Sequence, residues 1–279
     1  MSLILCKPES VRQPLYMDAL GVHLYSSQEL CYVIINHPFL VMDGFFSDTV
    51  RADVIIKQSV IDFIRKELEM PYLAAKIDTY LEEEKTDEAL LCVLRECGYT
   101  PKEEINRFQH KLETLRKMSP ADYAKEKADY YCKNRKYGMA IALYEQILAM
   151  PKETRGDDWF IGKVWNNLAA AYVNMFYFDK AMMAYERACD RTGSEKVLKQ
   201  MYFLKKLCPN LEMRERYLGA VTDDNRKEWD QEYDQAASKA SGSEEIQKIE
   251  RTSELPPEQG RQALVRQTAA WKREYREMA

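Results

Sequence analysis

Glycine and histidine are scarce in this chain of 279 residues, with ten and three copies respectively. Phosphate-binding loops and nucleophile turns need closely spaced glycines, and no such motif occurs in the sequence. The three histidines are far apart, and no His-Glu-x-x-His zinc helix is present. The sequence therefore predicts no catalytic centre, no metal site and no cofactor, and the chain is not expected to be an enzyme.

An excess of positive charge is also missing, since 41 Lys and Arg residues stand against 45 Asp and Glu residues. Nucleic acids and anionic membranes generally bind basic surfaces, so neither partner is expected. The apolar stretch from Cys31 to Phe46 is interrupted by Asn36, Pro38 and Asp43, and a membrane span needs roughly 20 apolar residues. The first six residues lack the positive start of a signal peptide. These features predict a cytoplasmic protein.

The seven cysteines form neither a disulfide framework nor a paired Cys-x-x-Cys metal knuckle. Cys92 and Cys97 come closest, but no histidine lies near them in the sequence. We expect buried, reduced side chains, in agreement with a cytoplasmic protein.

Signals for the start and end of helices follow one another from residue 27 to about residue 219. Ser26 and Glu29 have the spacing of a capping box, which predicts a helix over residues 27–36. Apolar residues at helical spacing from Asp48 to Leu68 predict a long helix that ends before Pro71.

Further helix starts are indicated by Thr86, by Thr100–Pro101 and by Ser119–Pro120, and Gly98 marks a helix end. Near the N-terminus, Leu3–Cys6 and Gly21–Tyr25 carry strand-forming residues that predict a short β-hairpin. The chain is therefore expected to be all-α, apart from this hairpin.

One helix-turn-helix pattern occurs twice. Its first helix carries Trp165, Leu168, Ala169 and Tyr172, and its second carries Ala181, Tyr185 and Ala188. The second copy consists of Ala124, Ala128, Tyr131, Ala140 and Tyr144, and a degenerate third copy begins at Lys196 with Leu198, Met201 and Tyr202. The pattern resembles the tetratricopeptide (TPR) repeat, which implies an α-solenoid of stacked helical hairpins.

The two clear copies are 41 residues apart, whereas TPR units usually repeat every 34 residues. An insertion of seven residues is therefore expected in the loop over residues 152–158. Trp165, Tyr172 and Tyr185 are expected to fill the core between hairpins, so that Trp165→Ala would cost on the order of 3–5 kcal/mol.

In TPR proteins the first helices line a concave groove that binds an extended peptide or a helix of a partner. The resemblance places seven residues in this groove: Lys125, Asp129, Asn166, Asn167, Tyr172, Lys196 and Gln200. One TPR subclass, found in chaperone adaptors, holds a C-terminal carboxylate with Lys, Asn and Arg side chains. Lys125, Asn167 and Lys196 match this subclass, but Asp129 and Gln200 replace an Asn and an Arg. The alternative is that Lys125 and Lys196 are simply solvated on charged helices.

The sequence divides into a divergent helical region over residues 1–118, TPR-like repeats over 119–219 and a charged extension over 220–279. Residues 223–258 contain eleven acidic and five basic residues, which predicts a hydrated, poorly packed spacer. Residues 261–277 reverse this charge and are expected to form an amphipathic helix. Its stripe contains Leu264, Trp271, Tyr275 and Met278. This helix would either cap the last repeat or dock on a partner.

These observations favour a scaffold or adaptor that binds a protein or peptide partner in its concave groove. The alternative is an enzyme with its active site in the N-terminal half and a TPR module that recruits the substrate. A polar pocket within residues 1–118 would favour the enzyme. A DNA-binding regulator is disfavoured, because the sequence contains no basic recognition helix.

Overall fold

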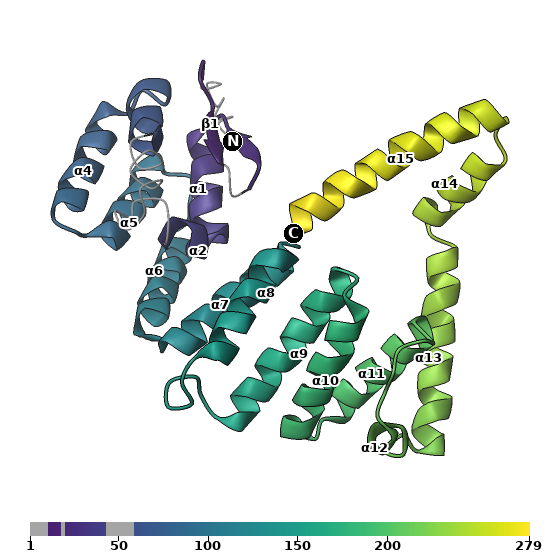
Figure 1. The fold of residues 1–279 in the computed structure, drawn as a ribbon. Helices are drawn as coiled ribbons and strands as arrows, with labels where there is room; N and C mark the ends of the chain where they lie inside the picture. Colours follow the sequence, from purple (N-terminus) through teal and green to yellow (C-terminus); the bar gives the residue numbers. More distant parts are fainter. Residues whose placement is uncertain (1–10, 18–19, 43–58) are drawn as a thin grey trace. The chain divides into compact units, whose positions relative to one another are not determined.

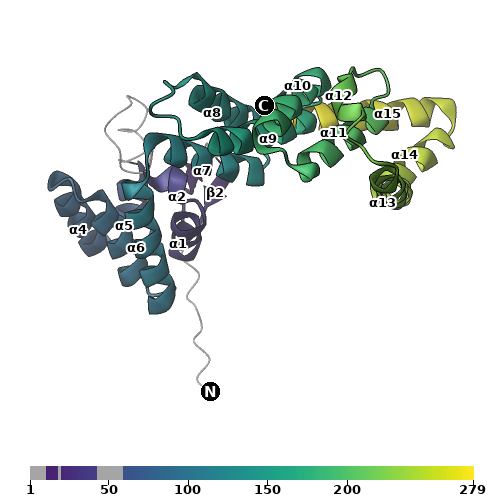
Figure 2. The same cartoon turned by 90° about the horizontal axis from the view of Figure 1, so that it is seen from below.

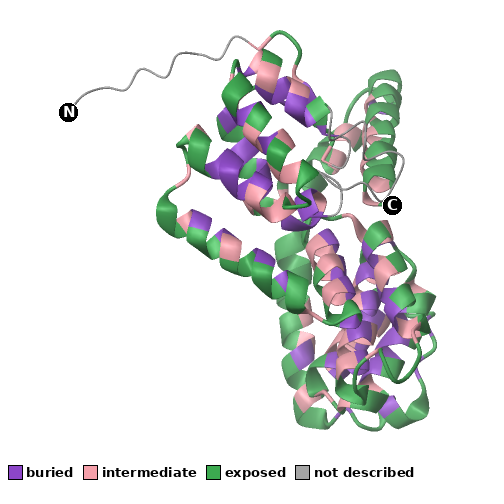
Figure 3. Ribbon diagram, turned by 90° about the vertical axis from the view of Figure 1, so that its left-hand side faces the viewer, coloured by how far each residue is buried: buried purple, intermediate pink, exposed green. Residues whose placement is uncertain are grey.

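The computed structural model describes residues 11–17, 20–42 and 59–279. Within these residues the chain is largely helical, with one two-stranded sheet, which confirms the all-α class (Figure 1). The chain divides into two compact units, Met1–Met118 and Ser119–Ala279. Buried residues gather on the inner faces of the helices within each unit (Figure 3).

The sheet of the first unit is an antiparallel hairpin of β1 (Leu15–Met17) and β2 (Val22–Leu24), with Leu15 opposite Leu24. Gly21 has a φ of 67°, a left-handed conformation that favours glycine at this tight turn. β2 lies where a strand was predicted, whereas the other predicted strand, Leu3–Cys6, lies outside the described residues. The strand that pairs with β2 is instead β1, since the short connection through Gly21 brings it directly alongside.

Helix α1 (Ser27–Asn36) begins at the predicted capping box. The backbone N–H of Glu29 donates to Ser26 Oγ at 3.2 Å, and the N–H of Tyr25 donates to Glu29 Oε2 at 2.5 Å. A short α2 (Pro38–Leu40) follows. The start of the long helix predicted from Asp48 lies outside the described residues, and its described end finishes as a π-helical turn over Phe63–Glu67.

Three helices complete the first unit: α4 (Pro71–Glu82), α5 (Thr86–Cys97) and α6 (Lys102–Lys117). Gly98 ends α5 with a φ of 71°, as predicted. Two capping predictions are wrong by one residue. Thr86 is the first helical residue of α5 rather than its N-cap, and Pro101 rather than Thr100 occupies the N-cap of α6.

The second unit begins with the predicted hairpins, formed by α7 (Pro120–Lys133) with α8 (Tyr137–Ala149) and by α9 (Asp158–Asn174) with α10 (Phe178–Thr192). Ser119 caps α7, since its Oγ accepts from the N–H of Asp122 at 3.1 Å. Helix α11 (Glu195–Leu207) lies beside α10, and α9, α10 and α11 follow one another side by side (Figures 1 and 2). We call α7–α11 the hairpin array.

Small residues allow the helices of the array to approach closely. Ala169 of α9 and Ala181 of α10 are fully buried, and a Cβ atom built on Gly162 would lie 2.5 Å from Thr192 Cγ2. Tyr172 and Tyr185 are buried, as predicted.

The prediction that Trp165 fills the core is wrong, because its side chain is only partly buried. The Arg187 guanidinium of α10 lies over its ring, 4.5 Å from the ring centroid. Trp165 therefore packs against a charged side chain and stays partly exposed.

The turns of three hairpins share one backbone geometry. Glu84, Arg135 and Phe176 each have a positive φ, of 57°, 59° and 60°. The residue after each donates its N–H to the carbonyl of a tyrosine five positions earlier, namely Tyr80, Tyr131 or Tyr172. This is the bonding of a Schellman-type helix end. The α4–α5 hairpin of the first unit thus turns in the same way as the two hairpins of the array.

The helix that follows α11 is the short α12 (Glu215–Leu218). Tyr217 anchors it to α10, because its hydroxyl oxygen lies within hydrogen-bond distance of two acceptors, Asp190 Oδ1 at 2.7 Å and the carbonyl oxygen of Glu186 at 3.1 Å.

The predicted hydrated spacer is wrong for residues 223–241. These residues form α13 (Asp223–Ser241), whose Trp229 is 2% exposed and packs against Tyr202 of α11 at a centroid distance of 5.6 Å. Lys206 of α11 also pairs with Asp230 at 2.7 Å. The acidic residues lie mainly on the exposed faces of α13. The high charge of this segment therefore gave no sign that Trp229 is buried against α11. Helices α14 (Glu244–Ser253) and α15 (Pro257–Met278) follow.

Candidate functional site

Asp129 of α7 is the centre of a hydrogen-bonded cluster on the first helices of the array. Its carboxylate accepts from Lys125 Nζ at 2.6 Å, from Asn167 Nδ2 at 2.9 Å and from the Tyr144 hydroxyl at 2.5 Å. Asn166 Nδ2 donates in turn to Asn167 Oδ1 at 3.2 Å. Four of the seven predicted groove residues are therefore joined across α7 and α9. We call Lys125, Asp129, Asn166 and Asn167 the first-helix face.

Tyr144 supports this face from α8, and its contact with Asp129 was not predicted from the repeat pattern. Its side chain is fully buried, and burial together with the Asp129 acceptor raises the pKa of the Tyr144 hydroxyl well above its usual range. Tyr144 therefore remains a hydrogen-bond donor at neutral pH, which holds the Asp129 carboxylate in one orientation.

Two side-chain amide oxygens of the array lack a hydrogen-bond partner among the described residues. They are Asn166 Oδ1 on α9 and Gln200 Oε1 on α11, and both atoms are buried. Buried polar atoms are nearly always paired, so these two oxygens are unusual acceptors within the array.

The two lysines of the predicted groove differ in environment. The Lys125 side chain is only 15% exposed and is paired with Asp129, so the expectation of a solvated lysine is wrong there. Lys196 is exposed, as expected for a solvated side chain. Because Asp129 already neutralises Lys125, the first-helix face offers little net charge to a carboxylate ligand.

Tyr172 does not join the first-helix face. Its hydroxyl donates to Glu145 Oε1 of α8 at 2.5 Å, and its ring lines a pocket of about 250 Å³ between α8, α9 and α10. Trp165 and Arg187 line the same pocket. The predicted groove therefore separates into a polar face and this distinct aromatic pocket.

The predicted C-terminal helix is observed as α15, but it does not cap the last repeat. Its end contacts the turns of the first two hairpins. There Arg135 pairs with Glu274 at 2.7 Å, and Tyr275 stacks on Phe176 with 6.4 Å between the ring centroids. The Arg135 guanidinium also approaches Met278 Sδ at 4.0 Å. Helix α13 covers α11 instead, through Trp229.

The other two residues of the predicted stripe, Leu264 and Trp271, are exposed. Their exposure leaves most of the apolar side of α15 uncovered within the described residues. Arg135 and Phe176 were not predicted as contact residues. The two residues are 41 positions apart, which is the distance between the two repeat copies, and each lies in the turn that ends the first helix of its hairpin.

No protein-family model, curated protein or solved structure matches this chain. Among the described helices, none combines the length and the hydrophobicity that a bilayer crossing requires. The described residues also contain no group of three or more side chains placed to bind a metal ion.

Proposed function

We propose that this chain is a TPR-type interaction scaffold whose first-helix face binds an extended peptide of a partner protein. The observation that carries the proposal is the hydrogen-bonded cluster across α7 and α9, together with the unpaired oxygens of Asn166 and Gln200. Side-chain amides both donate and accept hydrogen bonds, so they match the N–H and C=O groups of an extended backbone.

An internal peptide segment fits this face better than a C-terminal carboxylate. Lys125 is already paired with Asp129, and Gln200 stands where an anion-binding Arg would be needed. A carboxylate placed beside Asp129 would also be repelled. The proposed ligand therefore uses its backbone amides, with no requirement for a free C-terminus.

Selection of binders from a random peptide display library with the full chain tests this function. Selected peptides should bind with unchanged affinity when their C-termini are amidated. The double substitution Asn166→Ala/Gln200→Ala should weaken binding by roughly tenfold or more, because two ligand hydrogen bonds are lost. Asn174→Ala is the matched control, since the Asn174 amide bonds only to the Ala170 carbonyl of its own helix among the described residues.

Loss of binding on amidation would overturn the internal-peptide assignment. Equal affinities of the double variant and the Asn174→Ala control would remove the first-helix face as the binding site. Circular dichroism of each variant establishes that the fold is retained.

A further inference from the structure

Helices α14 and α15 leave nearly all of their surface uncovered. Gly260 is the one buried residue of α15, and α14 has none. Two pockets lie along α15, one of about 660 Å³ beside α14 and one of about 870 Å³ beside the turn between α9 and α10. Both are lined by Thr268 and Lys272, so the two pockets adjoin at these residues, and we call them together the α15 groove.

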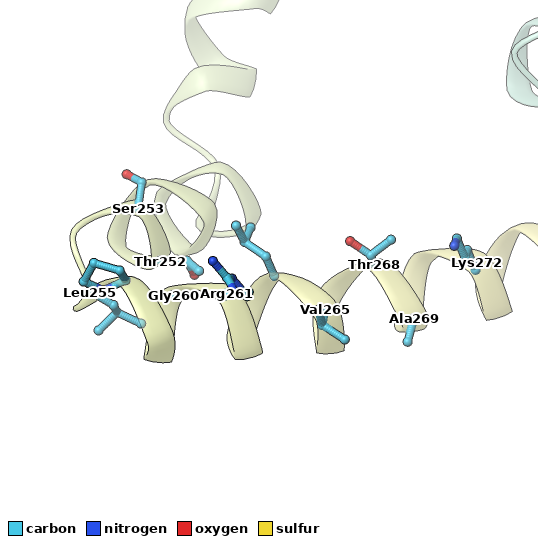
Figure 4. Close-up of a pocket in the computed structure, with 11 residues that line it drawn as sticks. Thr252, Ser253, Leu255, Gly260, Arg261, Val265, Thr268, Ala269 and Lys272 are labelled. Carbon is cyan, nitrogen blue, oxygen red and sulfur yellow. The ribbon is translucent and has the colours of Figure 1, made fainter.

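The walls of the α15 groove are apolar and helical. Figure 4 shows the part beside α14, where lining side chains follow α15 from Gly260 to Lys272. The exposed large apolar side chains along the groove are Leu255, Leu264, Val265, Trp271, Phe176 and Leu207. Val265 is 64% exposed and Phe176 is 65% exposed. Such an exposed row of large apolar side chains is typical of an interaction surface.

The charges along the groove are mainly positive. Arg261, Lys272 and Arg276 line it without an ion pair among the described residues. The acidic lining residue, Glu274, is already paired with Arg135. This surface is thus basic in a chain whose net charge is −4.

We propose that the α15 groove binds an amphipathic helix of a partner protein, with acidic residues beside its apolar face. A helix fits because it pairs its own backbone groups, whereas the groove walls are helices with no strand edge for an extended chain. Acidic residues on the partner complement Arg261, Lys272 and Arg276. The segment from Arg261 to Arg276 is about 22 Å long, which matches a partner helix of roughly 15 residues.

This groove is separate from the first-helix face. The two surfaces share no residue and differ in chemistry, since one carries amides and the other carries apolar and basic side chains. The chain would therefore bind an extended peptide at the first-helix face and a helix in the α15 groove.

A fluorescein-labelled synthetic helix with Leu on one face and Glu on the others is the probe. Fluorescence anisotropy with the full chain should detect its binding, and a peptide with Lys in place of Glu should bind roughly tenfold more weakly or worse. Lys272→Glu/Arg276→Glu should reduce affinity for the acidic peptide by a similar factor. The matched control is Arg266→Glu/Arg273→Glu, which makes the same charge change on α15 outside the groove lining and should retain affinity.

Val265→Glu should abolish binding of the acidic helix while circular dichroism remains unchanged, because this exposed side chain supports no core. Equal losses for the groove pair and the control pair would overturn the proposal, since net charge alone would then explain binding. Sedimentation that shows a dimer disrupted by Val265→Glu would assign the groove to a second copy of the chain. Binding to phosphatidylserine vesicles, but not to the peptide, would assign it to a lipid surface.

Discussion

Arg135 and Phe176 occupy backbone positions that ordinarily favour glycine, with φ values of 59° and 60°. A left-handed conformation costs a residue with a Cβ atom about 1 kcal/mol or more. Both side chains contact the end of α15, Arg135 through Glu274 and Phe176 through Tyr275. The two positions of the array with a left-handed backbone at a residue other than glycine therefore coincide with two of the points that hold the end of α15.

Arg135→Gly should relieve this backbone cost while removing the ion pair with Glu274. An exposed ion pair contributes about 0–1 kcal/mol, so the free energy of unfolding should be unchanged or slightly raised. Arg135→Ala, which loses the pair without relieving the backbone, should be less stable by about 1 kcal/mol than Arg135→Gly. Urea denaturation measures the difference, and a glycine variant less stable than the alanine variant would contradict the argument.

Trp165→Ala and Tyr185→Ala should differ clearly in stability. Tyr185 is buried and burial raises its pKa to about 12, so its truncation should cost roughly 3–5 kcal/mol. Trp165 is partly exposed beneath Arg187, so its truncation should cost only about 1–2 kcal/mol. Equal costs in chemical denaturation would show that Trp165 belongs to the core after all.

At the scale of single elements, α13 depends on a carboxylate that the sequence did not single out. Hydrogen bonds from Lys206 and then from Tyr202 hold the pKa of Asp230 below its usual value. Because this pKa is lower in the folded chain than in the unfolded one, the contact stabilises folding at neutral pH. The stabilisation is lost as pH falls from about 5 through the lowered pKa.

Acidification should therefore loosen α13 from α11 before the array unfolds. The indole N–H resonance of Trp229 reports this step, because Trp229 is buried at the same contact. Asp230→Asn should remove most of the pH dependence of that resonance. A resonance that responds equally in both proteins would show that Asp230 does not control the packing of α13.

Local signals in the sequence predicted local structure well. The cap at Ser119 and the helix end at Gly98 need only neighbouring residues, so both could be predicted. The left-handed turn at Phe176 could not, because nothing about phenylalanine favours that conformation. The burial of Trp229 could not be predicted for another reason. Its segment is highly charged on average, and a single buried side chain does not change that average.

The candidate site was predictable only in part. Lys125, Asp129 and Asn167 were placed together by the repeat pattern, and they do form one cluster. Tyr144 reaches the same carboxylate from 15 residues away on another helix, a contact that spacing on one helix does not reveal. Tyr172 does not belong to this cluster, because its hydroxyl donates to Glu145 of α8.

At the scale of the whole molecule, the second unit should fold without the first. Its core is built from its own hairpins, with Tyr144, Leu168 and Tyr185 all buried within it. Residues 119–279 expressed alone should give a helical circular dichroism spectrum and a cooperative thermal transition. A gradual, non-cooperative transition would show that the first unit supplies part of this core.

The return of α15 to the first hairpin also sets an order of assembly. Arg135 and Glu274 are 139 residues apart, whereas Tyr172 and Glu145 are only 27 residues apart. Closing the longer loop costs about 1.4 kcal/mol more in chain entropy. We therefore expect the hairpins to assemble first, and the contact of α15 to form last and to open first. The first-helix face is complete before α15 reaches the array, whereas the part of the α15 groove beside the turn between α9 and α10 exists only while that long loop stays closed.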